Sequence, residues 1–334
     1  MTLPYTPTVL ATPIVNPSAG SQGVAPIPYL SNSMYEFAPT AINVANLVPG
    51  GDAAQQAQVL ADVLLRASRW ADTYCFGADA AGSGASLAAN LSIEQASTRV
   101  KMGELRLICD YRPIQQVIGI DVGFTPGNVA SIGPQVASNV RIGRRTLYVP
   151  LWGIPTRSGD VGGPSSLWSV DGSVYAVWSY VAGYPHTRLV NNVTASATSC
   201  VVKSTDGNGG VWGALISPYF TVFDGQYTET VKVTAVTPGT TTATLTTTPF
   251  VNAHTVPSAP DFLPFTTIAP DIQQAVISLT TMLIKTRGVK SLTMPSMPGA
   301  APSRQGLAQA GALEDFDIAA RLLHPYAIRN KSKN

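Results

Sequence analysis

The residues of this chain that could do chemistry begin with its three histidines, His186, His254 and His324. Zinc and other metal sites need ligands at short, fixed spacings, such as HExxH or CxxC. The histidines are scattered, and none has a second ligand three or four residues away. His324 precedes a proline that ends a predicted helix, where a capping or surface role is expected. The spacing of the three histidines therefore predicts neither a bound metal ion nor a cofactor.

Nucleophilic catalysis has equally little support in the sequence. The stretch GSGAS at 82–86 is the nearest approach to a GxSxG nucleophile turn, and it lies in a predicted loop. The stretch DGNGGVWG at 206–213 resembles a nucleotide loop only faintly, because Trp212 stands where the third glycine belongs. It also leads into a β pattern, so it has no helix N-terminus to hold phosphate. A β-turn is the preferred interpretation.

A pair of carboxylates could serve glycoside hydrolysis. Glu229 lies in a predicted strand among Thr and Val and is the acid most worth following. Four further acids fall at predicted helix starts, where the helix dipole explains them: Asp271, Glu314, Asp315 and Asp317. We therefore predict that the protein is not an enzyme.

The aromatic stretch VWSYVAGYPHTRLV at 177–190 is the other candidate for a ligand site. Alternation places Trp178 and Tyr180 on one face of a strand, and Gly183 and Pro185 then end it. His186 falls in the predicted turn with no companion ligand. The stretch therefore predicts a core strand followed by a turn.

Composition favours a folded protein that works inside an assembly. Apolar residues make up 45% of the chain, but charged residues only 12%, about half of the ~25% of ordinary domains. The net charge is +2, which gives no support to phosphate tracking by bulk charge. Three widely spaced cysteines suggest buried thiols and a reducing cytoplasm. No signal peptide and no membrane-spanning run of apolar residues is expected.

Three helices are predicted from apolar residues recurring with a 3.6-residue period. The first spans 52–76, with Asp52 suited to the N-cap and Gly77 to the C-terminal stop. The second spans 269–287, with Pro270 in its first turn. The third spans 313–323. A shorter helix is expected around 34–47, interrupted near Pro39.

Between the first two long helices, from about 100 to 247, the pattern changes to short runs of β-branched and aromatic residues separated by turns. In TTATLTTT, Ala243 and Leu245 alternate with threonines, as in a half-buried strand. Several short strands of this kind favour an antiparallel sandwich or barrel.

The predicted fold class is α+β: a small helical core interrupted by a large antiparallel β-sandwich or barrel insertion, with extended terminal arms. The predicted divisions are an N-terminal arm, the first part of the helical core, the β domain, the second part of the core, and a C-terminal arm containing the short helix. They span 1–30, 31–98, 99–265, 266–288 and 289–334.

A series of segments in this order resembles the head-to-tail adaptor (connector) proteins of tailed bacteriophages, of the actinobacteriophage type with a β insertion. The series comprises RASRWADTYC, MGELRL, YRPIQQVIGI, YVAGYPHT, DGQYTETVKV with TATLT, and DIQQAVISLTTMLIKTRG. It covers roughly residues 29–330. The size of the β block departs from the plainest adaptors.

The resemblance implies a structural protein of the virion neck, made in the host bacterial cytoplasm. Such adaptors form a ring of twelve copies between the portal protein and a tail stopper or tail-terminator protein. DNA passes through the ring without sequence-specific binding, and no membrane is involved. The C-terminal arm would face the portal, with these interface candidates: Met294, Met297, Arg304, Tyr326, Ile328, Arg329, Lys331 and Lys333.

Two alternatives remain. The β block could be a binding module for cell-surface carbohydrate, with exposed tryptophans as stacking platforms; the candidates are Trp152, Trp168, Trp178 and Trp212. The chain could also be another neck or tail protein, such as a stopper.

Overall fold

The computed structural model describes residues 27–286 and 312–327, apart from 46, 78–85, 102, 133–138, 144, 151–172, 204–217, 238 and 240. The chain divides into two compact units, which we describe separately. Among the described residues, the first unit comprises Asn90–Gly183. The second unit comprises the rest, on both sides of this segment in the sequence.

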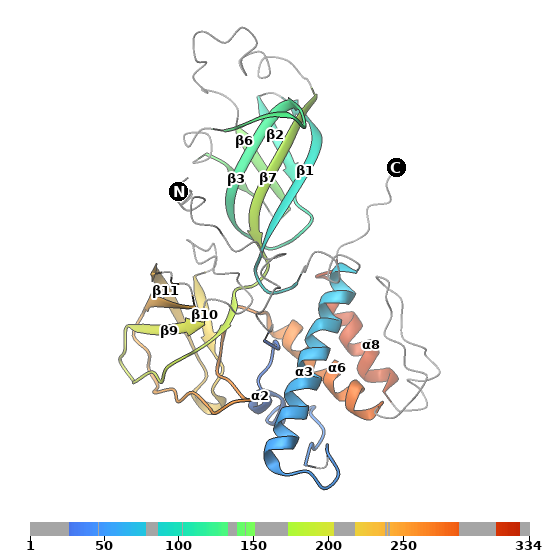
Figure 1. The fold of residues 1–334 in the computed structure, drawn as a ribbon, viewed down its shortest axis with the longest axis vertical. Helices are drawn as coiled ribbons and strands as arrows, with labels where there is room; N and C mark the ends of the chain where they lie inside the picture. The colour runs from blue at the N-terminus through green and yellow to red at the C-terminus, as the bar shows by residue number, and fades with distance from the viewer. Residues whose placement is uncertain are drawn as a thin grey trace. The chain divides into compact units, whose positions relative to one another are not determined.

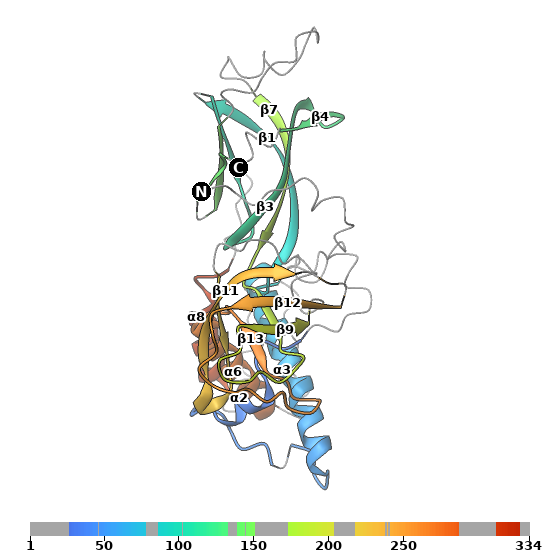
Figure 2. The ribbon, with the colours of Figure 1, turned by 90° about the vertical axis from the view of Figure 1, so that its left-hand side faces the viewer.

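The first unit is one curved, seven-stranded antiparallel sheet (Figures 1 and 2). Its strands in sequence are β1 (Asn90–Lys101), β2 (Glu104–Ile108), β3 (Ile114–Thr125), β4 (Asn128–Ser131), β5 (Arg141–Ile142), β6 (Thr146–Pro150) and β7 (Ser173–Ala182). Their order across the sheet is β4-β3-β7-β1-β2-β6-β5. The long strands β1 and β3 pair with the two edges of β7, so β7 is an interior strand of the sheet.

The core of the first unit lies on one face of this sheet. Alternate residues of β7 are buried, among them Trp178 and Tyr180, so the predicted core strand is confirmed. The Tyr180 hydroxyl donates a hydrogen bond to Glu94 of β1 and accepts one from the Tyr111 backbone N–H, at 3.1 Å. The buried tyrosine therefore has partners for its polar end, as a buried hydroxyl requires.

The second unit contains a six-stranded antiparallel sheet in the order β8-β13-β10-β11-β12-β9. Its strands are β8 (His186–Arg188), β9 (Ser199–Lys203), β10 (Tyr219–Val222), β11 (Glu229–Thr237), β12 (Thr242–Thr247) and β13 (Pro264–Thr266). A bridge between Leu189 and Val202 joins the chain just after β8 to β9, which brings the two edges of the sheet together. Ala243 and Leu245 of β12 are buried between exposed threonines, as the alternation predicts.

In the described part of the second unit, four α-helices accompany this sheet: α2 (Asn32–Glu36), α3 (Ala53–Phe76), α6 (Pro270–Lys285) and α8 (Leu313–Leu323). The three long helices confirm the predicted ones. Asp52 caps α3 in a capping box with Gln55, and Gly77 ends it with a φ of 62°, a left-handed conformation that glycine adopts at little cost.

The long helices pack together through residues far apart in sequence. Trp70 of α3 meets Phe316 of α8 edge-on, with ring centroids 5.2 Å apart. The Tyr74 hydroxyl donates to the Ala320 carbonyl of α8, and Lys285 of α6 forms an ion pair with Asp315 at 2.7 Å. The helical core is therefore assembled from segments that precede and follow all the strands.

The first unit is inserted in the chain of the second unit at two adjacent points. The Ala89 N–H donates to the Tyr184 carbonyl at 2.8 Å, and the Tyr184 N–H donates to the Leu87 carbonyl at 2.7 Å. The segments that enter and leave the first unit are thus paired side by side. The α+β fold class, a helical core with antiparallel β-barrel or sandwich structure inserted, is confirmed.

Two local expectations were wrong, and one grouping differs. The helix expected at 34–47 is only α2, because Ser31 caps it earlier and it ends at Phe37, before Pro39. His186 does not lie in a turn but begins β8, fully buried. The strands expected in one domain at 99–265 form two sheets, and the second sheet belongs to the same unit as the helices.

Candidate functional site

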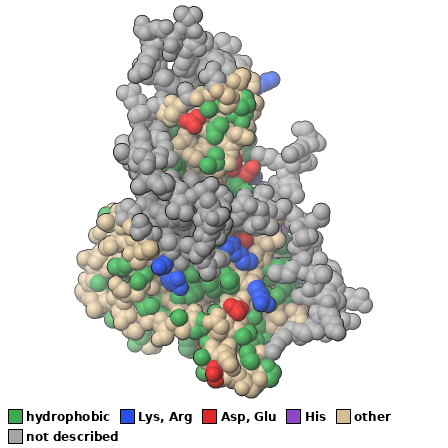
Figure 3. All heavy atoms as spheres, viewed as in Figure 1, with side chains coloured by type: hydrophobic (Ala, Val, Ile, Leu, Met, Phe, Trp, Pro, Cys, Tyr) green, Lys and Arg blue, Asp and Glu red, His purple; other side chains and the backbone are tan. Residues whose placement is uncertain are grey.

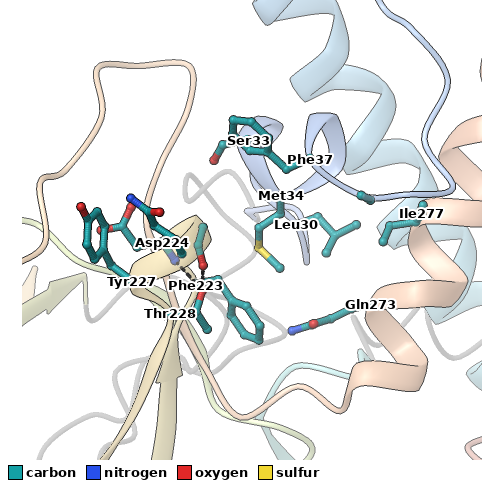
Figure 4. A pocket seen from close by; sticks show the side chains of 13 residues that line it. Leu30, Ser33, Met34, Phe37, Phe223, Asp224, Tyr227, Thr228, Gln273 and Ile277 are labelled. Carbon is teal, nitrogen blue, oxygen red and sulfur yellow. Dashed lines mark hydrogen bonds between the residues drawn. The ribbon is translucent and has the colours of Figure 1, made fainter. Parts of the chain in front are cut away.

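The second unit contains a pocket of about 780 Å³ (Figure 4). Residues of α2, α6 and the turn between β10 and β11 line it. In Figure 4 the side chains of Leu30, Met34 and Ile277 point toward its middle, whereas Tyr227 points away. Pockets of this size commonly hold small ligands or side chains of a partner. Its centre is apolar.

The short helix α2 is held in place at the pocket by contacts on its other faces. The Asn32 side chain donates to the Ala57 carbonyl of α3 at 2.9 Å, and the Asn32 N–H donates to Asp261. The Tyr35 side chain is buried, and its hydroxyl lies 3.1 Å from the Thr281 hydroxyl of α6. These contacts leave Met34 and Phe37 facing the pocket, and Phe37 is 80% exposed.

The opposite wall is the 3₁₀ turn Gly225–Tyr227. Thr228 closes the turn: its hydroxyl donates to the Gly225 carbonyl at 2.8 Å and accepts from the Asp224 N–H at 3.1 Å. Gly225 has a φ of 54°, which favours glycine. The turn sets Asp224 at the pocket wall and Glu229 at the start of β11.

Behind this wall, His254 lies between two carboxylates. Its Nδ1 is 3.0 Å from Asp224 Oδ2, and its Nε2 is 2.8 Å from Glu229 Oε1. A neutral imidazole carries a single N–H, whereas the imidazolium donates from both nitrogens. The charged form therefore satisfies both contacts. This cluster of Asp224, Glu229 and His254 ties the turn to the 251–254 loop.

Glu229 accepts two further hydrogen bonds, from the backbone N–H groups of Val251 and Asn252, both at 2.8 Å. Burial by itself raises the pKa of Glu229, but these two N–H groups and His254 lower it more, so the net pKa lies below the usual value. The Glu229 carboxylate therefore contacts all three partners: His254 and the two backbone N–H groups. It is the acid that the sequence singles out, and its partners were missed because they lie in separate turns.

The geometry of this cluster fits a structural tie better than acid–base catalysis. The His254 side chain is 0% exposed, so a substrate in the pocket cannot reach it. Both ring nitrogens already face carboxylates, so neither is left to accept a proton from a substrate. Among the described residues that line the pocket, none is a His, Cys or Lys. The pocket offers apolar contact at its centre and polar groups on its walls, from Ser33, Asp224, Gln226, Thr228 and Gln273.

A second buried polar cluster lies beside α3. The carboxylate of Asp72 accepts from the Tyr29 hydroxyl and from the Leu87 N–H, and its other oxygen lies 3.5 Å from Arg69. Burial raises the pKa of Asp72 to about 6. The ring of His186 packs edge-on against Tyr29, with centroids 5.6 Å apart. These contacts hold the segment around residue 29 against α3 and β8.

Of the predicted portal-interface residues, the structure describes Tyr326 only. Its ring meets Tyr184 edge-on, with centroids 6.1 Å apart, and it is half-buried. Burial raises its pKa, followed by the effect of Asp271. The remaining candidates lie outside the described residues: Met294, Met297, Arg304, Ile328, Arg329, Lys331 and Lys333.

The glycine-rich stretch at 206–213 and residues 82–85 also lie outside the described part of the chain, whereas Ser86 donates to the Ala88 carbonyl. The three cysteines are buried thiols, as expected. Among the described residues, no cluster of three or more His, Cys, Asp or Glu could hold a metal ion. No described helix is long and apolar enough to span a membrane.

No protein-family model, curated protein or solved structure matches this chain.

Proposed function

We propose that the chain is a structural subunit of a tailed-phage neck, forming a ring that joins the portal of the head to the tail and surrounds the DNA path. The observation that carries the proposal is the helical core of α3, α6 and α8. It is built from segments on both sides of the inserted strands, in the order that the resemblance to adaptor proteins implies.

The surface chemistry supports an assembly role. Figure 3 shows few charged side chains on the described face, among hydrophobic and uncharged polar ones. Large apolar side chains are exposed on the second unit, with Val251 at 77% and Tyr227 at 49% in addition to Phe37. Interface cores are poor in charge and rich in such residues.

A ring of identical subunits uses two different faces of each subunit. Under the proposal, the partners are other copies of the chain, twelve in all, together with the portal protein and a tail stopper or terminator. The chain would act without cofactor or catalysis, in the virion neck. The C-terminal arm, 289–334, would face the portal.

The carbohydrate-binding alternative is less well supported. Trp178 is 3% exposed in the core of the first unit, so it cannot stack on a sugar. Trp152, Trp168 and Trp212 lie outside the described residues.

The test is to mix the purified chain with the portal protein of the same virion and to image the particles by negative-stain electron microscopy. The proposal predicts an added ring on the portal. Portal particles without added density, at a tenfold excess of a folded chain, would contradict it.

A truncation lacking 328–334 sharpens the test. Helix α8 ends at Leu323, and the Ala327 N–H donates to the Leu323 carbonyl, so a truncation after Ala327 retains the whole helix and the turn that follows it. We expect the truncated chain to keep its thermal midpoint and to co-sediment less with portal. A matched control replaces Arg66, an exposed residue of α3, by Gln and should bind portal normally.

A further inference from the structure

The outer face of the first unit carries a row of four cations and one tyrosine across four neighbouring strands. Arg106 of β2 is paired with Tyr148 of β6, and Tyr148 is paired with Arg141 of β5. Arg99 of β1 lies one position from the Val100–Leu105 pair, which places it opposite Arg106. We call Arg99, Lys101, Arg106, Arg141 and Tyr148 the basic face.

Burial shows that these side chains share the outer face. Val100, Leu105 and Leu147, their neighbours along the strands, are buried in the core. Because side chains alternate along a strand, the residues directly before and after each buried residue point away from the core. The side chains of Arg106 and Arg141 are 62% and 71% exposed.

One carboxylate belongs to this face and orders it. Glu104 forms ion pairs with Arg106 at 3.2 Å and with Arg141. The two guanidinium groups also flank the Tyr148 ring, at 5.7 and 5.3 Å from its centroid. Four cations against one carboxylate leave this face with an excess of three positive charges.

Glu104 is the one carboxylate that forms ion pairs with these cations among the described residues. Within the part of the chain that the structure describes, Arg99 and Lys101 are exposed and form no ion pair. Among the described acids, Asp110 just beyond β2 lies 3.9 Å from Arg145, and Asp121 lies on β3, beyond β7 from this half of the sheet. In a chain with 21 Lys and Arg residues, this grouping is a local concentration that the net charge of +2 hides.

We propose that the basic face binds the phosphate backbone of duplex DNA without reading its sequence. Guanidinium groups match phosphate oxygens in a fork-like geometry, and a tyrosine hydroxyl can donate to them. Strands lie about 4.8 Å apart, so the row spans about 14 Å and faces several phosphates of a duplex. That DNA is the physiological polyanion rests on the proposed neck function.

An acidic peptide is the competing occupant, and the sheet disfavours it. Strands β1, β2 and β6 are each paired on both sides, so a peptide could add as a further strand only beside β5, which is two residues long. A regular row of cations instead suits a partner whose charge repeats uniformly along its length.

The experiment measures binding of a fluorescein-labelled 30-base-pair duplex by anisotropy, with the full chain and without portal, from 50 to 200 mM NaCl. Three to four phosphate contacts predict a slope of log Kobs against log [salt] of about −3. Arg141→Gln should weaken binding about tenfold at 50 mM NaCl and reduce the slope by about 1. The triple variant R99Q/K101Q/R141Q should abolish most of the salt-dependent binding.

Arg66→Gln, which removes one exposed cation from α3 in the second unit, is the matched control and should bind DNA as the parent does. Equal losses in R66Q and R141Q, or unchanged binding by a folded triple variant, would overturn the proposal. Labelled polyglutamate binding as tightly as the duplex would overturn the assignment to nucleic acid. Portal is absent from this assay, so its outcome is independent of whether the chain forms a ring on portal.

Discussion

The buried histidine His186 should make the second unit sensitive to acid. Its side chain is fully buried, and Nε2 donates to the Pro28 carbonyl at 2.9 Å. Its Nδ1 has no hydrogen-bond partner among the described residues, so a proton added there meets no acceptor. Burial accordingly lowers the pKa of His186 to about 4.

The sign and size of the effect follow from linkage. The unfolded chain takes up a proton on this residue near pH 6.5, whereas the folded chain does so only near pH 4. The unfolded state therefore binds more protons between these values, and stability falls as pH falls. The full effect is about 3 kcal/mol, of which about 2 kcal/mol is lost between pH 7.5 and pH 5.

Asp72, which reaches His186 through Tyr29, works in the opposite direction. Its folded pKa of about 6 lies above its ordinary value, so the folded state binds more protons as pH falls. Protonation of Asp72 should therefore raise the free energy of unfolding by about 1 kcal/mol between pH 7.5 and pH 5. The stability of the parent protein therefore changes only by the difference between the His186 and Asp72 contributions. The contribution of His186 must be isolated by substitution.

The assay is urea unfolding followed by circular dichroism at pH 7.5 and pH 5, for the parent and for His186→Gln. Glutamine keeps a donor for the Pro28 carbonyl and does not titrate. The stability difference between parent and variant should shift by about 2 kcal/mol in favour of the variant at pH 5. His324→Gln, which removes the exposed histidine at the end of α8, is the control. Parallel losses in the parent and in H186Q would refute the reasoning.

Two further predictions concern the second unit. Glu229→Gln should destabilise it by about 2–3 kcal/mol at pH 7, because three hydrogen bonds to the carboxylate are weakened and His254 loses a charged partner. The lowered pKa of Glu229 means that this stabilisation is present above its unfolded pKa and is lost as pH falls through the folded pKa. The gap in urea midpoint between parent and E229Q should therefore narrow in acid, with the exposed Glu36→Gln as control; a gap that widens would contradict this. Replacing 90–183 by a short Gly-Ser loop should leave the second unit folded, because the Leu87–Ala89 segment and Tyr184 already pair. Far-ultraviolet circular dichroism and cooperative unfolding check this, and loss of the helical signal would show that the second unit needs the inserted sheet.

The helices were predictable because each has its own local signals. Asp52 and Gly77 bound α3, Pro270 begins α6, and the apolar period fills the rest. The α2 helix was placed too late because Ser31, its N-cap, lies in a segment without periodicity. A five-residue helix is held by tertiary contacts such as those of Asn32 and Tyr35, which local sequence does not contain.

The strands were predictable individually, but their partition into two sheets was not. Alternation tells which face of β7 is buried, yet it does not tell that β7 pairs with β1, some eighty residues earlier. The functional features could not be predicted in full for the same reason. Glu229 was singled out, but His254 and Asp224 reach it from other turns. The basic face is assembled from four strands, none of which carries a run of charge by itself.

Assembly of this chain as a ring on a portal would raise the mass of each portal particle by a fixed amount. Mass photometry of the portal, alone and after addition of the 35.0 kDa chain, measures this directly. A ring of twelve copies predicts a discrete shift of about 420 kDa per portal particle, saturating with added chain. An unshifted portal peak beside free chain would contradict the account.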